Sequence, residues 1–316
     1  MKLGIYGGTF NPPHIGHVRA VSAAIMQLKL DLLLIVPAGI PPHKALPPGS
    51  PDMDERMALA SLSFAGLPGT IVTDLELKKE GVSYTAETLD TVRAMYPGYE
   101  YFLIMGADMF LSLETWRDVG RLLNYVTPAV LSRNDGDARE INDYAEQLYK
   151  KQNTKTVIIE NDVTEISSTE LREQLPKRGG LAFVEDSTYA YIIKNRLYGA
   201  KAEWEWLRTR VFETMKPNRI THTLGCEAEA LKLAGRWGAD VDDAREAAIL
   251  HDITKHLGLE DQLQLCRKYD IMTTMSKRLR LSSSTQKQAR LSPGTYTVPH
   301  NRYMTQYFGT PQAGQI

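Results

Sequence analysis

The most informative stretch of this chain is Gly7-Gly8-Thr9-Phe10-Asn11-Pro12-Pro13-His14-Ile15-Gly16-His17, directly after an apolar run at Lys2–Tyr6. The two glycines allow a tight turn and a close approach of the backbone to a phosphate. Pro12 and Pro13 suit the first turn of a helix, and the N-terminal N–H groups and dipole of a helix favour an anion. The stretch therefore predicts a strand, a glycine turn and a helix whose start faces a phosphate.

Short apolar runs alternate with helical patterns as far as residue 200. The runs typical of buried strands are Lys2–Tyr6, Asp31–Val36, Thr70–Leu75, Tyr99–Met105, Pro128–Leu131 and Lys155–Ile159. The helical patterns are Ile15–Lys29, Asp52–Phe64, Thr85–Met95 and Ala138–Lys151. This alternation predicts an α/β domain with a doubly wound parallel sheet, in which ligands bind beyond the carboxyl ends of the strands.

Length and composition limit the class of protein. The chain has 316 residues, which at roughly 150 residues per domain suggests two domains. Its 43% hydrophobic and 24% charged residues exclude a disordered or fibrous chain. No apolar run approaches the ~20 residues that span a bilayer, and Met1–Tyr6 has no leader pattern. Two cysteines form no disulfide framework, so we expect a reducing cytoplasm and no membrane partner.

Two groups of polar residues favour phosphate chemistry. His14 and His17 are three residues apart on one helical face, where imidazoles can stabilise developing charge on phosphorus; two surface histidines beside a glycine turn are the alternative. The second group is Ile166-Ser167-Ser168-Thr169-Glu170-Leu171-Arg172, after the sixth strand. A capping box explains Ser167 and Glu170 without any function, whereas Arg172 suits a pyrophosphate.

Together these motifs resemble the nucleotidyltransferase superfamily with the histidine-x-glycine-histidine signature, whose fold is Rossmann-like. The resemblance implies transfer of a nucleotide from ATP with His14, His17 and Arg172 as catalytic residues, and with Mg²⁺ on the triphosphate oxygens. The ATP-binding residues that it implies are Gly7, Gly8, Thr9, Phe10, His14, Gly16, His17, Gly106, Asp108, Ile166, Ser167, Ser168 and Arg172.

Further strings resemble the nicotinate-nucleotide adenylyltransferase family over nearly all of residues 1–200: Pro41–Lys44, Val82–Leu89, Met105–Phe110 and Leu113–Arg117. This resemblance implies that nicotinate mononucleotide is the acceptor and that Trp116 stacks on its pyridine ring; a half-buried packing role is the alternative for Trp116. The implied acceptor-binding residues are Lys44, Thr85, Ala86, Trp116 and Arg133. Phosphopantetheine and nicotinamide mononucleotide are the alternative acceptors.

The signature His14-Ile15-Gly16-His17 also occurs in class I aminoacyl-tRNA synthetases, and Thr274–Arg278 faintly resembles their second signature. Binding of tRNA needs a basic surface. Residues 1–271 carry a net charge of −7, so we expect no nucleic-acid partner.

The strand signals stop after residue 200, and residues 201–271 predict a smaller all-α domain. Its helical patterns are Glu203–Met215, Ile220–Trp237 and Asp242–His251, with Asp240 and Asp242 placed to cap a helix. The residues His222, His251 and Asp252 resemble the start of the metal site of HD-domain phosphohydrolases that act on symmetrical diadenosine tetraphosphate. The downstream ligands of that family are missing, so we expect a truncated domain that holds no divalent metal such as iron. Helix-capping polar residues in a partly folded appendage are the alternative.

Residues 272–316 differ from the rest in composition. They carry six basic residues and no acid, which gives a net charge of +6, and we expect them to be largely disordered. A shifted reading frame over Ser284–Thr297 and from Tyr303 permits strings that resemble the missing HD segments. We hypothesise a frameshift near Ile271–Ser282, which sequencing of the gene would test. Formation of a homo-oligomer stays open.

Overall fold

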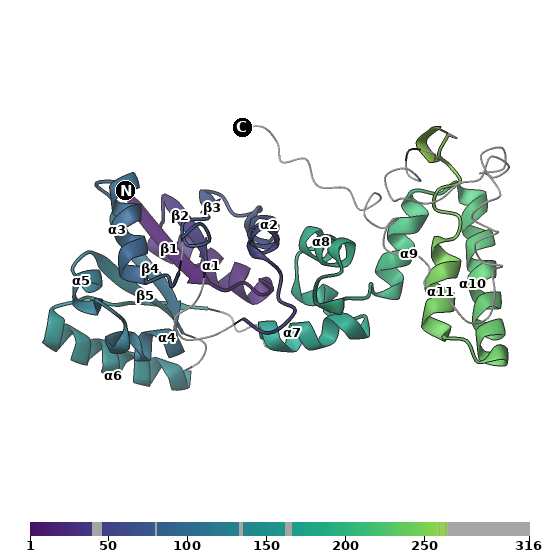
Figure 1. Ribbon diagram of the computed structural model, residues 1–316. Helices are drawn as coiled ribbons and strands as arrows, with labels where there is room; N and C mark the ends of the chain where they lie inside the picture. Colours follow the sequence, from purple (N-terminus) through teal and green to yellow (C-terminus); the bar gives the residue numbers. More distant parts are fainter. Residues whose placement is uncertain are drawn as a thin grey trace. The chain divides into compact units, whose positions relative to one another are not determined.

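The computed structural model describes residues 1–39, 46–79, 81–132, 135–161, 166–258, 260–262 and 264. Residues 1–192 and 197–201 form one compact unit built on a six-stranded parallel sheet in the order β3-β2-β1-β4-β5-β6 (Figure 1). The strands are β1 (Lys2–Gly8), β2 (Leu32–Pro37), β3 (Thr70–Val72), β4 (Glu100–Gly106), β5 (Val126–Ser132) and β6 (Val157–Glu160). The predicted doubly wound α/β fold is confirmed.

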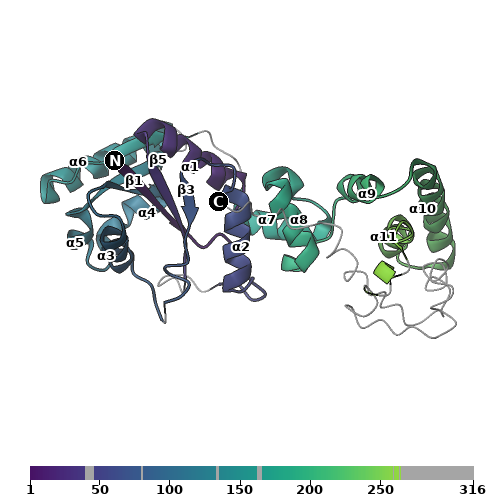
Figure 2. The same cartoon turned by 90° about the horizontal axis from the view of Figure 1, so that it is seen from above.

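Helices cover both faces of this sheet, as Figure 2 shows from above. On one face, α1 (Ile15–Leu28) and α2 (Met53–Phe64) pack on Leu33, Ile35 and Ile104. The other face carries α3 (Thr85–Met95), α4 (Ala107–Leu111), α5 (Val119–Leu123) and α6 (Asp135–Gln152), packed on Leu34 and Leu103 among others. Alternate residues of the inner strands β2 and β4 thus enter opposite cores, which is why these strands appear in the sequence as continuous apolar runs.

Two helices and three 3₁₀ turns follow β6. They are α7 (Ser168–Gln174), α8 (Asp186–Asn195) and a set of 3₁₀ turns at Leu175–Lys177, Leu181–Phe183 and Leu197–Gly199; a further 3₁₀ turn, Leu113–Thr115, follows α4. Helices α4, α5 and α8 were not predicted from the sequence. Strand β3 is shorter than the predicted Thr70–Leu75, because the chain turns after Val72 and Lys78 N–H donates to the carbonyl of Asp74.

The start of α1 differs from the prediction. The helix begins at Ile15, so Pro12 and Pro13 precede it instead of forming its first turn. His14 is the N-cap residue, with extended backbone angles of φ −144° and ψ 170°. A residue followed by proline disfavours helical angles, which accounts for Asn11 and Pro12 lying outside the helix.

The second unit, over its described residues, comprises 193–196 and the chain from Ala202 onward. Its helices are α9 (Trp204–Glu213), α10 (Pro217–Trp237) and α11 (Val241–Leu250), close to the three predicted helices. Proline begins α10 and Gly238, at φ 68°, ends it. The carboxylate of Asp240 accepts from Asp243 N–H at 2.8 Å, so Asp240 caps α11 as predicted.

One buried carboxylate joins the three helices of the second unit. Glu227 of α10 is 4% exposed and accepts two hydrogen bonds from Arg208 of α9. Its Oε1 also lies 3.4 Å from Nε of Arg245 on α11. A buried charge needs such partners, because loss of one leaves an uncompensated ion.

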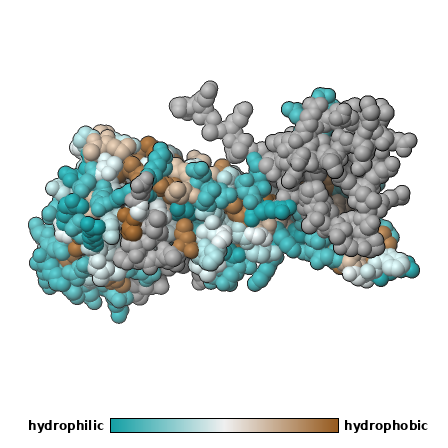
Figure 3. Space-filling view, viewed as in Figure 1, coloured by the Kyte–Doolittle hydropathy of each residue, from teal (hydrophilic) through white to brown (hydrophobic). Residues whose placement is uncertain are grey.

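The surface seen in Figure 3 is mostly hydrophilic, with apolar residues in small groups. None of the helices in the described part of the chain combines the length and the apolar character that crossing a bilayer requires.

Candidate functional site

The order of the strands locates the site. Because β1 and β4 are neighbours while the chain winds outward from them in opposite directions, their carboxyl ends flank the crevice where such sheets bind ligands. Gly7 and Gly8 end β1, and Gly106 ends β4. Asp108 is exposed in the first turn of α4. The predicted ATP-binding residues at the ends of these two strands therefore lie together at the carboxyl end of the sheet.

His14 and His17 lie against each other at the start of α1. Their ring centroids are 3.8 Å apart, and His14 N–H donates to Nδ1 of His17 at 3.2 Å. Because Nδ1 of His17 accepts this bond, its neutral imidazole carries the proton on Nε2. His14 is 9% exposed and His17 is partly exposed. The pair can donate charge-assisted hydrogen bonds to an anion at the helix start.

Phe10 explains why the turn needs a glycine. Its ring is 1% exposed, packs edge-on to His17 at 5.5 Å between centroids and also contacts Phe64. A Cβ on Gly8 would lie 2.9 Å from two atoms of the Phe10 ring. A Cβ on Gly7 would meet only the Val36 carbonyl, at 3.9 Å. Gly8 is thus required by packing, in addition to any approach to phosphate.

The start of α7 is bonded to the turn after β1. Oγ of Ser168 donates to the Pro12 carbonyl at 2.9 Å. The Arg172 guanidinium donates to the Asn11 carbonyl at 2.6 Å and to Oγ1 of Thr169 at 3.0 Å. The two predicted phosphate motifs, far apart in sequence, therefore meet in space.

The structure also confirms the capping box that Ser167 and Glu170 form at the start of α7. Ser167 Oγ accepts from Glu170 N–H at 3.2 Å, while the Glu170 carboxylate accepts from the backbone and hydroxyl of Ser167. These bonds lower the pKa of the exposed Glu170 carboxyl. Ser167 and Glu170 thus have a structural role, and Ile166 precedes them with partial exposure. The unsatisfied N–H groups of this helix start still favour an anion.

Asn11 and Arg56 stabilise the turn after β1 through hydrogen bonds. Neither residue was given a role from the sequence. Asn11 is 3% exposed; its Nδ2 donates to Ser50 at 2.7 Å and its Oδ1 accepts from the Tyr198 hydroxyl at 2.9 Å. Burial raises the pKa of Tyr198, which keeps that hydroxyl a donor. Arg56 is 2% exposed and donates to the carbonyls of Ala38, at 2.6 Å, and Thr9, at 3.4 Å.

A sequence signal for Arg56 was available. The buried residues of α2 follow helical spacing, at Arg56, Leu59, Ala60, Ser63 and Phe64. An arginine on an otherwise apolar stripe is buried with partners or not at all, because an unpaired buried charge is costly. Burial lowers the pKa of this guanidinium, which the nearby Tyr198 and Asp52 partly offset.

The predicted acceptor-binding residues that the structure describes are Thr85, Ala86 and Trp116. Thr85 and Ala86 form the first turn of α3, with Ala86 3% exposed. Trp116 follows the 3₁₀ turn after α4 and packs, partly buried, on the core beneath α3 and α4. Arg117 stacks on the ring of Tyr84, the N-cap residue of α3, at 4.4 Å. Lys44 and Arg133 lie outside the described residues.

Glu76 connects the start of α3 with the loop after β2. Its carboxylate accepts from Oγ1 of Thr88 on α3 at 2.7 Å and from the backbone of Gly39. Burial raises the pKa of the Glu76 carboxyl, and these hydrogen bonds oppose the shift. A Cβ on Gly39 would lie 2.3 Å from the carbonyl oxygen of Glu76, so the loop after β2 approaches this segment closely.

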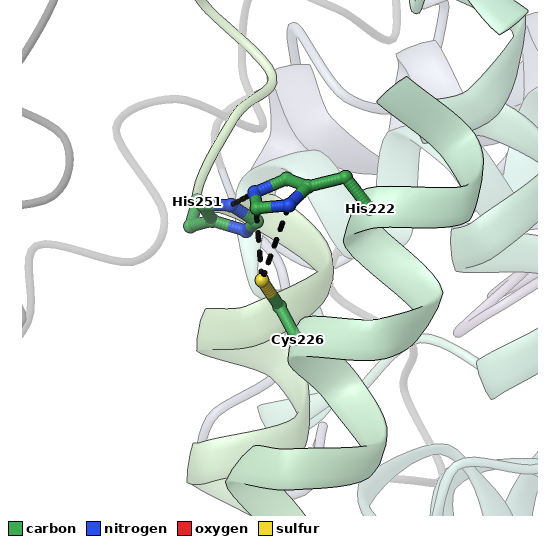
Figure 4. A group of neighbouring side chains, drawn as sticks. All are labelled: His222, Cys226 and His251. Carbon is green, nitrogen blue, oxygen red and sulfur yellow. Dashed lines mark hydrogen bonds between the residues drawn. The ribbon is translucent and has the colours of Figure 1, made fainter. Parts of the chain in front are cut away.

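In the second unit, the structure brings the predicted residues His222, His251 and Asp252 together. The Nε2 atoms of the two histidines are 3.3 Å apart, and Asp252 oxygens lie 3.3 Å from His251 Nε2 and 3.7 Å from His222 Nε2. Cys226, which the sequence analysis did not single out, lies beside them one turn after His222 (Figure 4). The group His222, Cys226 and His251 could hold a metal ion.

Charged side chains lie on one side of the group His222, Cys226 and His251. The Asp252 side chain is 1% exposed and pairs with Lys255 at 2.6 Å and Arg219 at 3.6 Å, yet neither of its oxygens accepts a hydrogen bond. Burial, with the charge of Asp252 as a lesser cause, raises the pKa of the Cys226 thiol. Carboxylate, imidazole and thiol donors facing one another suit a divalent transition metal.

Residues 5–174 match the cytidylyltransferase-like family. The chain belongs to this family. Residues 219–280 match the HD domain. The chain is 35% identical over 199 residues to a probable nicotinate-nucleotide adenylyltransferase of Synechococcus sp. (strain JA-2-3B'a(2-13)), covering 62% of this chain and 96% of that protein. Its first domain is thus homologous to these adenylyltransferases, as the sequence predicted.

Other relatives agree. A probable nicotinate-nucleotide adenylyltransferase of Fusobacterium nucleatum is 37% identical over 179 residues, 56% of this chain and 89% of that protein. The solved nicotinic acid mononucleotide adenylyltransferase of Plasmodium falciparum, complexed with NaAD, superposes with a TM-score of 0.50 at 19% identity. That match covers 63% of this chain and 98% of the other, and at this identity it supports the fold alone.

Proposed function

We propose that this protein transfers the adenylyl group of ATP to nicotinate mononucleotide, releasing pyrophosphate and forming nicotinate adenine dinucleotide. The observation that carries the proposal is the contact between the two phosphate motifs: Arg172 and Ser168 bond to the same turn that presents His14 and His17. Relatives at 35% and 37% identity bear the name of this activity and match the chain over most of their length.

The reaction exchanges one phosphorus–oxygen bond for another. An oxygen of the acceptor's phosphate forms a bond to the α-phosphorus of ATP, and the bond from that phosphorus to the β-phosphate oxygen breaks. Pyrophosphate leaves with the electron pair. Because no protein atom is covalently involved, positioning and stabilisation of charge supply the rate.

The residues of the turn and of α7 take complementary roles. His14 and His17 donate hydrogen bonds to the α-phosphate oxygens, where charge develops as the new bond forms. The N–H groups at the start of α7, with Arg172, hold the leaving pyrophosphate. ATP enters with Mg²⁺ bound to its phosphates, and the ion neutralises part of their charge.

The acceptor occupies the region between α3 and Trp116. The start of α3 offers N–H groups around Thr85 and Ala86 to the pyridine carboxylate, and Trp116 offers an aromatic face. Nicotinamide mononucleotide lacks this carboxylate and phosphopantetheine lacks the pyridine, so both are poorer fits to the two features together.

A pyrophosphate-release assay tests the proposal. With ATP present, we compare nicotinate mononucleotide, nicotinamide mononucleotide and phosphopantetheine at equal concentration, and expect the first to give the highest kcat/KM. His17→Ala should lower kcat by at least ~10²-fold, the scale of losing a preorganised donor. Met26→Ala, at a residue of the same helix that is 68% exposed, is the matched control. Near-normal turnover by His17→Ala, or a preference for phosphopantetheine, contradicts the proposal.

A further inference from the structure

Arg56 of α2 is a buried cation without a role in the proposed reaction. It is 2% exposed and has the largest of the fully buried side chains that the structure describes. The guanidinium donates to the Thr9 carbonyl of the turn after β1 at 3.4 Å, and to the carbonyls of Ala38 and Gly39, after β2, at 2.6 Å and 3.5 Å. One arginine therefore joins two loops at the carboxyl ends of neighbouring strands, where sheets of this topology bind ligands.

The charge of Arg56 is not neutralised by an ion pair within the described part of the chain. Its hydrogen-bond partners there are the three carbonyl oxygens, and its buried Nε has none. Asp52 is the acid that acts on it, but the Asp52 side chain is exposed and accepts from Glu55 N–H at 2.8 Å. Burial lowers the pKa of the guanidinium, because the cation has lost water without gaining a carboxylate. A buried charge of this kind is costly.

The second unit shows the paired arrangement instead. Arg208 donates to both carboxylate oxygens of the buried Glu227, at 3.0 Å and 2.5 Å. These bonds raise the pKa of Arg208, whereas that of Arg56 is lowered. A cation that serves packing alone is commonly buried with such a partner. The carbonyl partners of Arg56 leave a net positive charge beside the turn after β1.

A second guanidinium meets the same turn in the same way. Arg172 donates to the Asn11 carbonyl at 2.6 Å, two residues after the carbonyl that accepts from Arg56. His14 and His17 follow directly, at the start of α1. Carbonyl oxygens satisfy the hydrogen bonds of both arginines but carry no formal charge. A polyanion bound at this turn therefore supplies the charge that the fold lacks there.

We propose that Arg56 is a positioning residue of the ATP site, whose buried charge attracts the triphosphate to the turn after β1 and whose hydrogen bonds fix that turn against the loop after β2. The charge acts across the turn, since the guanidinium itself bonds to backbone oxygens of the two loops. ATP before the transfer, and pyrophosphate after it, provide the counter-charge. The inference rests on the proposed function, because it takes this turn as the phosphate site.

Isothermal titration calorimetry of the full chain with ATP and Mg²⁺, without an acceptor, tests the proposal. Arg56→Gln keeps a donor but removes the charge, whereas Arg56→Lys keeps the charge without the planar fork. By Coulomb's law, a unit charge acting over about 10 Å at an effective dielectric constant of about 20 changes an equilibrium about tenfold. We therefore expect Arg56→Gln to raise the Kd for ATP about tenfold and Arg56→Lys to raise it much less. Arg93→Gln removes the same charge from the last turn of α3, at the opposite end of the sheet, and is the matched control that should keep the Kd.

Thermal unfolding of the same variants separates charge from packing. Both Arg56 variants lose bonds to the carbonyls, so both should lower Tm. A purely structural role predicts that the Kd for ATP follows Tm, whereas the proposal predicts that it follows the charge.

The exposed Asp52 tests the same charge without risk to the fold. Asp52→Asn keeps a good N-cap side chain and removes the acid that opposes Arg56. The Kd for ATP should fall about twofold, the scale of an exposed charge pair. Asp54→Asn makes the same change two residues further along the exposed first turn and is the control, with a smaller effect.

Three results would overturn the proposal. They are an Arg56→Gln protein that binds ATP as tightly as the unmodified chain, equal weakening by Arg56→Gln and Arg56→Lys, and an Asp52→Asn protein that binds ATP no more tightly than Asp54→Asn. An unmodified chain that binds no ATP contradicts the proposed function as well. Adenylyl transfer by the unmodified chain, with unchanged ATP affinity in Arg56→Gln, overturns this inference alone.

Discussion

Replacement of Asn11 by alanine tests whether the side-chain hydrogen bonds of Asn11 stabilise the turn before His14. The Asn11 side chain makes two hydrogen bonds, to Ser50 and to the Tyr198 hydroxyl. Each contributes about 1 kcal/mol net, and the half-buried Tyr198 hydroxyl, left without its partner, adds about 1–3 kcal/mol. Ser50 keeps a partner, because its hydroxyl also donates to the Pro47 carbonyl at 2.7 Å. The expected loss is therefore about 3–5 kcal/mol.

Thermal unfolding measures this loss. A domain of about 200 residues loses about 2–4 °C per kcal/mol, so Asn11→Ala should lower Tm by roughly 10 °C. Asn142→Ala is the matched control, since that exposed asparagine donates to the Ala138 carbonyl of its own helix, and it should shift Tm by no more than about 2 °C.

A double-mutant cycle separates the bond to Tyr198 from loss of packing. Tyr198→Phe alone should cost about 1–2 kcal/mol, and adding it to Asn11→Ala should cost little more than Asn11→Ala alone. Strictly additive losses, or an Asn11→Ala protein as stable as the Asn142→Ala control, would refute the reasoning.

Three other changes have calculable outcomes. Gly8→Ala places a Cβ 2.9 Å from the Phe10 ring and should cost about 1–3 kcal/mol in urea unfolding, whereas Gly7→Ala, with 3.9 Å of room, should cost less. Glu227→Ala strands two arginines and should cost about 3–5 kcal/mol, read as faster hydrogen exchange in α9–α11; Glu229→Ala, 61% exposed, is the control. Burial raises the pKa of folded Glu76 above its unfolded value of 4.5, so this group's contribution to stability rises as pH falls through the folded pKa; Glu76→Gln should remove that dependence in unfolding curves between pH 7 and pH 4. Equal slopes for Glu76→Gln and the unmodified protein would contradict the last expectation.

The sheet could be predicted because its strands are buried on both faces. Leu33–Val36 and Phe102–Met105 alternate between two cores, so every position is apolar and the run stands out from its surroundings. Helix α8 could also have been found, since Tyr189, Ile192 and Ile193 are buried at helical spacing. The helices α4 and α5 are only five residues long, too short for a periodic pattern to be visible.

The phosphate motifs could be predicted from residue types, whereas for their supports the sequence offers only the burial of Arg56, through the helical spacing of α2, and not the partners. His14, His17 and Arg172 are polar residues at points where the chain leaves a strand or begins a helix. The supports Arg56 and Tyr198 act through contacts across long sequence separations, and no local pattern encodes such partners. Cys226 was missed although the sequence predicts the helix Ile220–Trp237, in which Cys226 follows His222 by four residues and lies on the same face.

The bonds to Asn11 also determine when during synthesis the site can exist. Tyr198 lies 187 residues after its partner, and Arg172 lies 161 residues after the carbonyl to which it donates. A nascent chain that has reached α6 contains both histidines of the signature but not the residues that secure their turn. The site can therefore form only after the final residues of the first unit have been synthesised. Residues after Lys201 are translated later still, so every residue of the first unit has been synthesised before the helices of the second unit, which begin at Trp204.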